Sequence, residues 1–359
     1  MIYYITLLFG SIITVFTCFT NARLLKKLGF FILYMWLFSL SALRWNIGTD
    51  YKNYVKQYFD INNAGYWDPK IEPLYYLLVR FTKLSVDNVQ LLFASISLIT
   101  ILAYWCYSKK QNMLLAIFCF YTVLYLPSYS LIRQALAVCI VIIASQYVIE
   151  GKNKKSIFMV FIAAGFHYSA LLFIPFILLK KIKIKSLIGL SLLLALIFLT
   201  VYYNIPRIIL NSSLLQSTKY GVYSNNIFSN PTELGTGLGV IIKALPAIIF
   251  IVIADLFGWT NKESKKDKVY FLLWVNYAYL TAIILSLSVQ IFNRLSDFFM
   301  FVPVITLCEI YNLIKNKNNR FIIVGVIAML LLINFILLII KNPSSNLGGL
   351  GISPYQSIL

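Results

Sequence analysis

Residues 321–340 have the sequence FIIVGVIAMLLLINFILLII, which contains no charged side chain. At about 1.5 Å per residue, a helix of this length is about 30 Å long and matches the hydrocarbon core of a bilayer. The run is also too long and too uniformly apolar for an ordinary helix of a soluble protein. It therefore predicts a transmembrane helix and, with it, a membrane protein.

Other apolar runs of spanning length precede this one along the chain. They lie at about 2–20, 28–43, 88–108, 111–128, 133–149, 186–203, 237–257, 269–289 and 297–314. Together with 321–340 they predict about ten transmembrane helices. We therefore expect an all-α polytopic membrane protein, in which residues 1–359 form a single integral membrane domain.

The composition excludes a soluble enzyme, because 60% of the 359 residues are hydrophobic and only 12% are charged. Soluble domains are typically about 45–50% apolar and about 25% charged. The net charge of +19 would suggest nucleic-acid binding in a soluble protein. In a membrane protein, the position of that charge along the chain decides what it means.

Basic side chains gather in six short segments between the apolar runs. The groups are Arg23/Lys26/Lys27, Lys109/Lys110, Lys152/Lys154/Lys155, Lys180/Lys181/Lys183/Lys185, Lys262/Lys265/Lys266/Lys268 and Lys315/Lys317/Arg320. Because positively charged loops stay in the cytoplasm, all six are expected on that side. This arrangement places both termini outside, and it explains most of the positive charge without a nucleic-acid partner.

The apolar segment 156–179 allows two interpretations. Basic loops flank it on both sides, so the charge rule places both of its ends in the cytoplasm. About 24 residues are too few for two full crossings, and we therefore expect a re-entrant hairpin with its bend near Gly165, Phe166 and His167. The alternative is one tilted span, which would break the charge rule.

Three longer segments are expected outside, namely 44–87, 204–236 and the tail 341–359. Within the first, residues 72–84 are amphipathic. The polar face of this stretch consists of Glu72, Tyr75, Tyr76, Arg80 and Lys83. It is too short and too charged to span a bilayer, so we expect an outer interfacial helix.

Metal-binding and nucleotide-binding motifs are missing from the sequence. The five cysteines form no CxxC pair, and the chain has one histidine. A zinc site or a disulfide framework is therefore not supported. There is also no Gly-rich phosphate loop, no GxSxG and no HExxH. We expect neither a bound metal nor a cofactor.

Three arginines mark the outer ends of predicted spans, where ionisable side chains are often functional. They are Arg44, Arg133 and Arg294. Arg133 has no acidic residue within ten positions, so it needs an anion from elsewhere. Each arginine could instead be an interface anchor, and Arg294 could simply pair with Asp297.

Asp50, Glu72 and His167 are the candidate proton-transfer groups. Asp50 could accept a proton from a sugar hydroxyl, or it could cap the helix that follows it. Glu72 precedes Pro73, where a carboxylate also favours a helix start. His167 lies at the proposed bend and is either a hydrogen-bond donor to a ligand or a packing residue. With the arginines, these groups suit an anionic, diphosphate-linked lipid sugar.

Four blocks of the sequence resemble the EpsG-like branch of the Wzy-type polysaccharide (O-antigen) polymerases. The blocks are Arg44-Trp45-Asn46-Ile47-Gly48-Thr49-Asp50-Tyr51 with Tyr54; Glu72-Pro73-Leu74-Tyr75-Tyr76; Arg133-Gln134-Ala135-Leu136-Ala137 with Ala163-Ala164-Gly165-Phe166-His167-Tyr168-Ser169-Ala170; and Asn293-Arg294 with Pro354-Tyr355-Gln356. Their order and spacing extend along nearly the whole chain.

The resemblance implies a glycosyltransferase of the bacterial inner membrane that acts on its outer side. Such enzymes join undecaprenyl-diphosphate-linked oligosaccharide donors and acceptors into lipopolysaccharide O-antigen, capsule or exopolysaccharide. A flippase and a chain-length regulator are the partners it implies. The resemblance does not indicate which sugar polymer is made.

In the reaction expected here, Arg44, Arg133 and Arg294 hold the leaving diphosphate without a metal. Asp50 or His167 acts as the base, and Glu72 positions the sugar or serves as a second acid. Further substrate contacts are expected from Tyr51, Tyr54, Gln134 and Asn293. The competing interpretations are a transporter or flippase of the same lipid-linked glycan and an O-antigen-ligase-like transferase. A transporter should place its charges along a path open to both sides.

Overall fold

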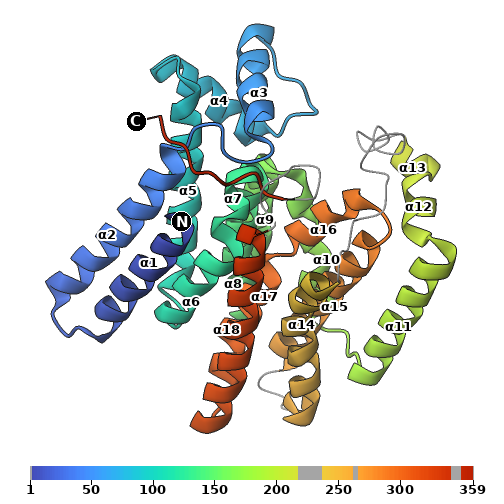
Figure 1. The fold of residues 1–359 in the computed structure, drawn as a ribbon. Coiled ribbons are helices and arrows are strands. Elements are labelled where there is room, and N and C mark those ends of the chain that lie inside the picture. Colours follow the sequence, from blue (N-terminus) through green and yellow to red (C-terminus); the bar gives the residue numbers. More distant parts are fainter. Residues whose placement is uncertain (1, 217–236, 262–265, 341–348, 359) are drawn as a thin grey trace. The chain divides into compact units, whose positions relative to one another are not determined.

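The computed structural model describes residues 2–216, 237–261, 266–340 and 349–358, and its regular secondary structure there is helical (Figure 1). Within these ranges, strand-like pairing is limited to one isolated antiparallel bridge between Arg44 and Ser357. The prediction of an all-α fold is confirmed. Parts of the predicted outer segment 204–236 and of the tail 341–359 lie outside the described residues.

Seven helical segments in the described chain are long and apolar enough to cross a membrane. They are α2 (Arg23–Ala42), α5 (Val89–Ser108), α8 (Ile132–Ile149), α14 (Leu238–Leu256), α15 (Lys266–Ser286), the segment Gln290–Leu313 and α18 (Lys317–Ile340). Each agrees with a predicted span. A polytopic membrane fold is therefore confirmed.

The other three predicted spans coincide with shorter apolar helices. These are α1 (Ile2–Phe19), the segment Met113–Tyr125 and α11 (Ser186–Tyr203). In the second of these, α6 (Met113–Cys119) passes into the π-helix η1 (Phe120–Tyr125) before the short α7 (Pro127–Ser130). The wide π-turns and Pro127 interrupt the regular ladder of backbone hydrogen bonds.

The helices group into two compact units. The first comprises Met1–Gln146, Phe158–Leu171 and Leu331–Leu359, and the second comprises Tyr147–Ile157 and Leu172–Leu330. In the second unit α15 is the central helix, packing against α11, α14 and α17 (Phe301–Leu313). A single membrane domain can contain two such units, so the prediction of one domain stays a prediction.

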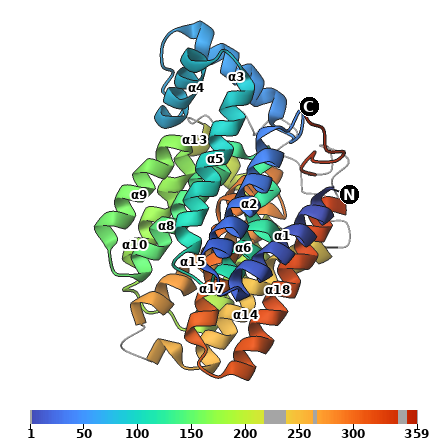
Figure 2. The ribbon, with the colours of Figure 1, turned by 90° about the vertical axis from the view of Figure 1, so that its left-hand side faces the viewer.

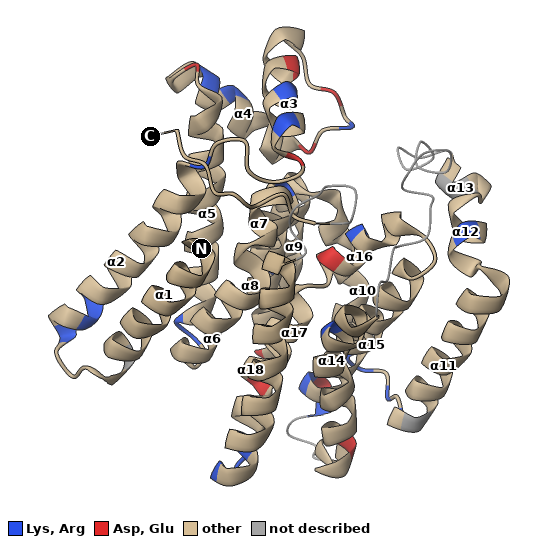
Figure 3. Cartoon of the chain, in the orientation of Figure 1, with Lys and Arg blue, Asp and Glu red and all other residues tan. Residues whose placement is uncertain are grey.

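In the first unit α1, α2 and α5 lie side by side (Figure 2). Beyond one end of α2 and α5 stand two shorter helices, α3 (Tyr51–Ala64) and α4 (Pro73–Ser85). Figure 3 shows charged residues at the start of α2 and again on α3 and α4, with few along the helices between. The basic start of α2 and the charged outer segment are therefore at opposite ends of this helix, as the topology requires.

Helix α4 covers the stretch 72–84, and its expected position at the interface stays a prediction. Of the expected polar face, Glu72 before the helix and Tyr75 within it are buried, whereas Leu77, Phe81 and Leu84 are exposed. A short helix with an exposed apolar side suits the boundary between the bilayer and water.

Segment 156–179 folds as a hairpin rather than a single span. It consists of the C-terminal part of α9 (Asn153–Phe166), the 3₁₀-helix η2 (Tyr168–Phe173) and α10 (Ile174–Leu179). The Nζ of Lys180 donates to Oδ1 of Asn153 at 2.8 Å, so the two ends of the segment meet. A straight helix over the same residues would separate these ends by about 40 Å.

Candidate functional site

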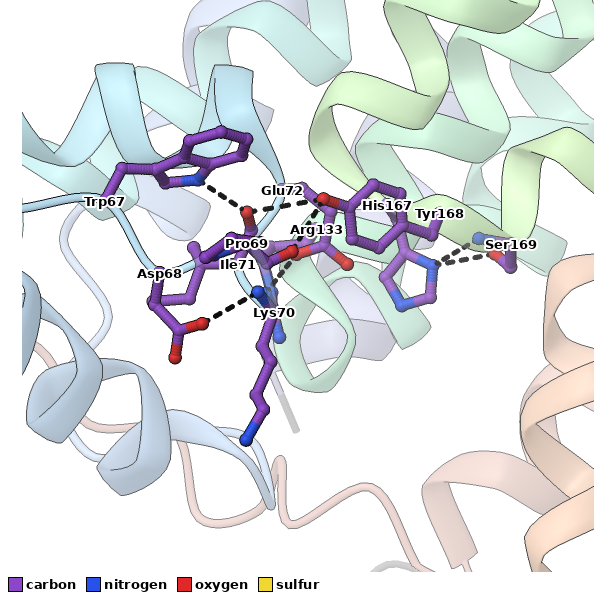
Figure 4. A network of polar contacts seen from close by, with 10 residues as sticks. All are labelled: Trp67, Asp68, Pro69, Lys70, Ile71, Glu72, Arg133, His167, Tyr168 and Ser169. Carbon is purple, nitrogen blue, oxygen red and sulfur yellow. Dashed lines mark hydrogen bonds and ion pairs between the residues drawn. The ribbon is translucent and has the colours of Figure 1, made fainter. Parts of the chain in front are cut away.

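Arg133 and Glu72 form a buried ion pair in the first unit (Figure 4). Glu72 comes directly before α4, and Arg133 lies in the first turn of α8. The Nη1 of Arg133 donates to Oε2 of Glu72 at 2.6 Å. The Glu72 side chain is 1% exposed and that of Arg133 is 18% exposed. Because a buried carboxylate needs a partner, Glu72 is the anion that the sequence required near Arg133.

Two tyrosine rings fix the plane of the Arg133 guanidinium. Its Cζ lies 4.8 Å from the ring centroid of Tyr75 and 5.6 Å from that of Tyr54. Burial raises the pKa of the Tyr75 phenol, so that ring stays neutral. The Nε of Arg133 is buried and makes no hydrogen bond within the described residues. The described residues therefore enclose this edge of the guanidinium.

The loop before Glu72 is held by side chains that donate to backbone carbonyl groups (Figure 4). Trp67 donates its Nε1–H to the carbonyl of Ile71 at 2.9 Å. The Tyr168 hydroxyl donates to the carbonyl of Pro69 at 3.0 Å and lies 3.5 Å from that of Ile71. Since Tyr168 belongs to the hairpin, the hairpin holds the loop that carries Glu72. Neither Trp67 nor Tyr168 was among the candidates from the sequence.

Gly165 allows the hairpin to approach α4. A Cβ at this position would lie 2.5 Å from Cγ of Leu74, closer than real Cβ atoms approach a neighbour. Any larger residue would push the tip of the hairpin away from the start of α4. The need for glycine here is thus steric and does not come from a left-handed backbone.

His167 lies at the bend, one residue before Tyr168, and is partly buried. Its Nδ1 is 2.7 Å from Oγ of Ser169 and 3.3 Å from the backbone nitrogen of Ser169. A backbone N–H can only donate, so Nδ1 is the acceptor and the neutral ring carries its proton on Nε2. In this tautomer the N–H donor of the His167 ring is Nε2.

Arg44 is placed differently from Arg133. It is 1% exposed, and its Cζ lies 5.0 Å from the ring centroids of both Phe93 and Tyr129. Its Nη1 donates to the carbonyl of Ser41 at 2.7 Å. The guanidinium is therefore enclosed rather than at the interface, and a diphosphate could reach it only if these rings moved.

Asp50 lies directly before α3 and is partly buried, and its side chain makes no capping hydrogen bond. The capping alternative is therefore not supported. The preceding Gly48 has φ +100°, and a Cβ there would lie 2.3 Å from the carbonyl oxygen of Tyr129. The N–H of Thr49 donates to Oγ of Ser130 at 3.2 Å. These contacts hold Asp50 close to the start of α8, the helix that carries Arg133.

The C-terminal tail binds the same turn. The N–H of Gly48 donates to the backbone carbonyl of Gly351 at 2.9 Å, and the N–H of Thr49 donates to the backbone carbonyl of Leu350 at 3.1 Å. The hydroxyl of Tyr355 donates to the carbonyl of Leu40 at 2.9 Å, and burial raises the pKa of this phenol to about 12. The tail thus forms part of the framework around Asp50, a role that the sequence did not reveal.

The remaining candidates divide between the two units. Tyr51, Tyr54 and Gln134 are buried in the first unit. Asn293 and Arg294 begin α16 (Asn293–Phe298) in the second, and Arg294 is exposed there.

Asp297 of α16 forms an ion pair with a residue of another helix. The Nζ of Lys243 lies 3.7 Å from Oδ1 of Asp297 and donates to Oγ of Ser296 at 2.9 Å. Lys243 therefore neutralises part of the negative charge of Asp297, the residue that the sequence suggested as a partner of Arg294. Within the described ranges, no group of three His, Cys, Asp or Glu residues is placed to hold a metal ion.

The geometry of the first unit suits an anionic ligand. A partly exposed arginine is fixed by a carboxylate and two rings, and a histidine lies on the adjoining hairpin. Such preorganised donors stabilise charge that develops on a ligand.

Residues 27–357 of the chain match the model of the EpsG family. This range contains every candidate site residue named above. No curated protein and no solved structure matches the chain.

Proposed function

This chain belongs to the EpsG family and is a membrane protein of polysaccharide biosynthesis, and from that premise we propose that it polymerises lipid-linked oligosaccharide repeat units. The reaction takes place on the outer side of the bacterial cytoplasmic membrane, with both chain termini on that side. A hydroxyl of one unit attacks the anomeric carbon of the sugar chain on a second unit. The new glycosidic bond forms as the bond to undecaprenyl diphosphate breaks, and the leaving diphosphate takes the electron pair.

The observation that carries this proposal is the guanidinium of Arg133, which Glu72 and the rings of Tyr54 and Tyr75 hold in place. The leaving diphosphate gains negative charge in the transition state. A guanidinium that is already oriented stabilises this charge without having to reorganise. Arg133 thereby supplies the positive charge that a metal ion supplies in other transferases.

The proton-transfer roles follow from the partners of each group. Glu72 is engaged with Arg133 and therefore acts mainly by orienting the guanidinium. His167 presents Nε2–H and donates to an oxygen of the diphosphate or of the sugar. Asp50 accepts the proton of the attacking hydroxyl, since it is a carboxylate held close to the start of the helix that carries Arg133. The aromatic residues of the outer segment contact the sugars.

The partners of this reaction are the donor and acceptor lipids, a flippase that delivers them and a regulator of chain length. Deletion of the gene, with complementation by the wild-type chain, tests the proposal through the surface glycan. Cells that carry single repeat units and regain long ladders on complementation support a polymerase. Loss of all surface glycan would show a flippase instead, and long polymer retained on the lipid carrier would show a ligase.

A further inference from the structure

An open cavity of about 360 Å³ lies beside the start of α3. Its walls are Trp45, Asn46, Tyr51, Lys52, Val55 and Val89. We propose that this cavity is a binding subsite for one or two sugar rings of the oligosaccharide. The choice of ligand rests on the proposed function, whereas the site itself rests on the shape and chemistry of the walls.

The size and lining of the cavity suit a saccharide. Small-molecule sites typically measure about 300–1,000 Å³ and combine apolar walls with a few polar groups. Val55 and Val89 supply apolar surface, while Asn46 and Lys52 supply hydrogen-bond donors. No carboxylate lines the cavity among the described residues, so a neutral polyhydroxylated ring meets no charge repulsion there.

Trp45 provides an aromatic platform. It is 50% exposed, although its neighbour Arg44 is buried. The flat indole can stack on the C–H face of a pyranose, and its N–H can bind a hydroxyl at the rim. The ring centroids of Trp45 and Tyr51 lie 6.1 Å apart with an angle of 66° between the planes. The two rings therefore form a corner rather than a flat surface.

Tyr51 provides a second aromatic wall. Its side chain is 4% exposed, so the ring is shielded from water on the side away from the cavity. An aromatic face of this kind can pack against the C–H groups of a sugar ring.

The walls are preorganised. The Tyr51 ring stacks on Phe93 with centroids 4.7 Å apart and planes within 10°. The backbone N–H of Trp45 donates to the carbonyl of Gln356 at 2.9 Å, so the tail fixes the base of the platform. A rigid wall loses little conformational entropy when a ligand binds.

The cavity is also correctly located for a sugar attached to the diphosphate at Arg133. Tyr51 and Tyr54 are three residues apart on α3, a separation of about 4.5 Å along the helix axis. The Tyr54 ring packs against the Arg133 guanidinium. A diphosphate at Arg133 would therefore have its sugars within reach of Trp45.

Isothermal titration calorimetry on the purified full-length protein in nanodiscs tests the subsite. The probe is the lipid-free oligosaccharide that mild acid releases from the lipid-linked repeat unit of the same cells. We expect Trp45→Ala, which removes the platform, and Val55→Trp, which fills the cavity, each to weaken binding at least tenfold. The matched control is Tyr66→Ala, because Tyr66 is an exposed aromatic residue of the same outer segment that does not line the cavity.

Polymer ladders in cells separate this inference from the proposed function. The Trp45→Ala variant should still make polymer but with shorter chains, whereas Arg133→Ala should make none. If Trp45→Ala and Val55→Trp bind the oligosaccharide like the wild type while Arg133→Ala abolishes polymer, the subsite is wrong and the function stands. If the cavity variants alter only the binding of phospholipid headgroups, the cavity is a lipid contact and the inference is overturned. Polymer made by Arg133→Ala would overturn the function instead.

Discussion

The guanidinium of Arg133 and the carboxylate of Glu72 meet at 2.6 Å although 61 positions separate them in the sequence. The pair joins the outer segment to the first turn of α8. It also fixes the orientation of the Arg133 guanidinium. The position of Glu72 therefore controls the group that is proposed to bind the leaving diphosphate.

Two substitutions of Arg133 distinguish the effect of its positive charge on polymerisation from the effect of its planar shape. We expect Arg133→Ala to reduce the polymerisation rate by about 100–1000-fold, the usual effect of removing a donor that stabilises developing negative charge. Arg133→Lys keeps the charge but loses the planar fork between the two tyrosine rings, so it should recover little. The rate of polymer formation in membrane vesicles measures the activity of both variants, and Arg80→Ala on α4 is the control. Activity of Arg133→Lys close to the wild type would contradict a role that needs the planar group.

The charge-free pair Arg133→Met with Glu72→Gln should recover stability but not activity. Arg133→Met alone removes the ion-pair partner of a buried carboxylate, which typically costs about 3–5 kcal/mol. Adding Glu72→Gln removes that charge. We therefore expect the melting temperature in detergent to fall in the single variant and to rise again in the double variant, while both make no polymer. Polymer made by the double variant would show that the pair is structural only.

Substitutions of His167 test which of its ring nitrogens donates a hydrogen bond to the substrate. Because Nδ1 accepts from the backbone of Ser169, the donor is Nε2. The side-chain amide of His167→Gln can reach the position of Nε2, whereas that of His167→Asn cannot. We expect His167→Gln to retain part of the activity, and His167→Asn to be as inactive as His167→Ala. Better activity of the asparagine variant than of the glutamine variant would refute this tautomer.

Tyr168→Phe should weaken the support of Glu72 without removing a group that touches the substrate. The hydroxyl makes one hydrogen bond at 3.0 Å to the carbonyl of Pro69, and such a bond contributes about 0.5–1.5 kcal/mol. We expect the turnover number to fall by up to about tenfold while the KM for the lipid-linked unit changes little. Tyr202→Phe, at an exposed tyrosine of α11, is the control. An unchanged turnover number would exclude a positioning role.

Two glycines with left-handed backbones should respond differently to alanine. Gly48 and Gly65 both have positive φ, at +100° and +72°, but only Gly48 faces a close neighbour. Gly65→Ala should cost about 1 kcal/mol of folding free energy from the backbone alone. Gly48→Ala must also displace the carbonyl of Tyr129, so it should lower the melting temperature further and abolish polymer. Equal effects of the two variants would contradict a steric role of Gly48.

The transmembrane helices could be predicted because a run of about 20 apolar residues directly indicates a helix in the hydrocarbon core of a bilayer. Run 321–340 became most of α18. The length of 156–179 between two basic loops left a hairpin and a single tilted span as alternatives, and the contact between its ends decides for the hairpin. The run 111–128 was less regular than expected, because its helix passes into π-turns before Pro127. Periodicity describes which residues are apolar and says little about such local departures from α-geometry.

The site could be predicted only in part. The lack of a local anion near Arg133 was visible in the sequence, but its partner Glu72 was not, since a contact over such a distance leaves no periodic signal. Tyr168 and Trp67 bind backbone carbonyl groups, which every residue has, so no complementary residue type marks these contacts. The burial of Arg44 was missed because its aromatic neighbours come from other helices.

The docking of the tail onto the turn at Gly48 has a consequence for the order of assembly during synthesis. Tyr355 and Leu40 are joined although 315 positions lie between them, and the tail follows α18 in the chain. The turn is made early by the ribosome, but the carbonyl groups of Leu350 and Gly351 reach its N–H groups only after α18 has been made. Until then the turn before Asp50 has Ser130 as a partner but lacks the two hydrogen bonds to the tail.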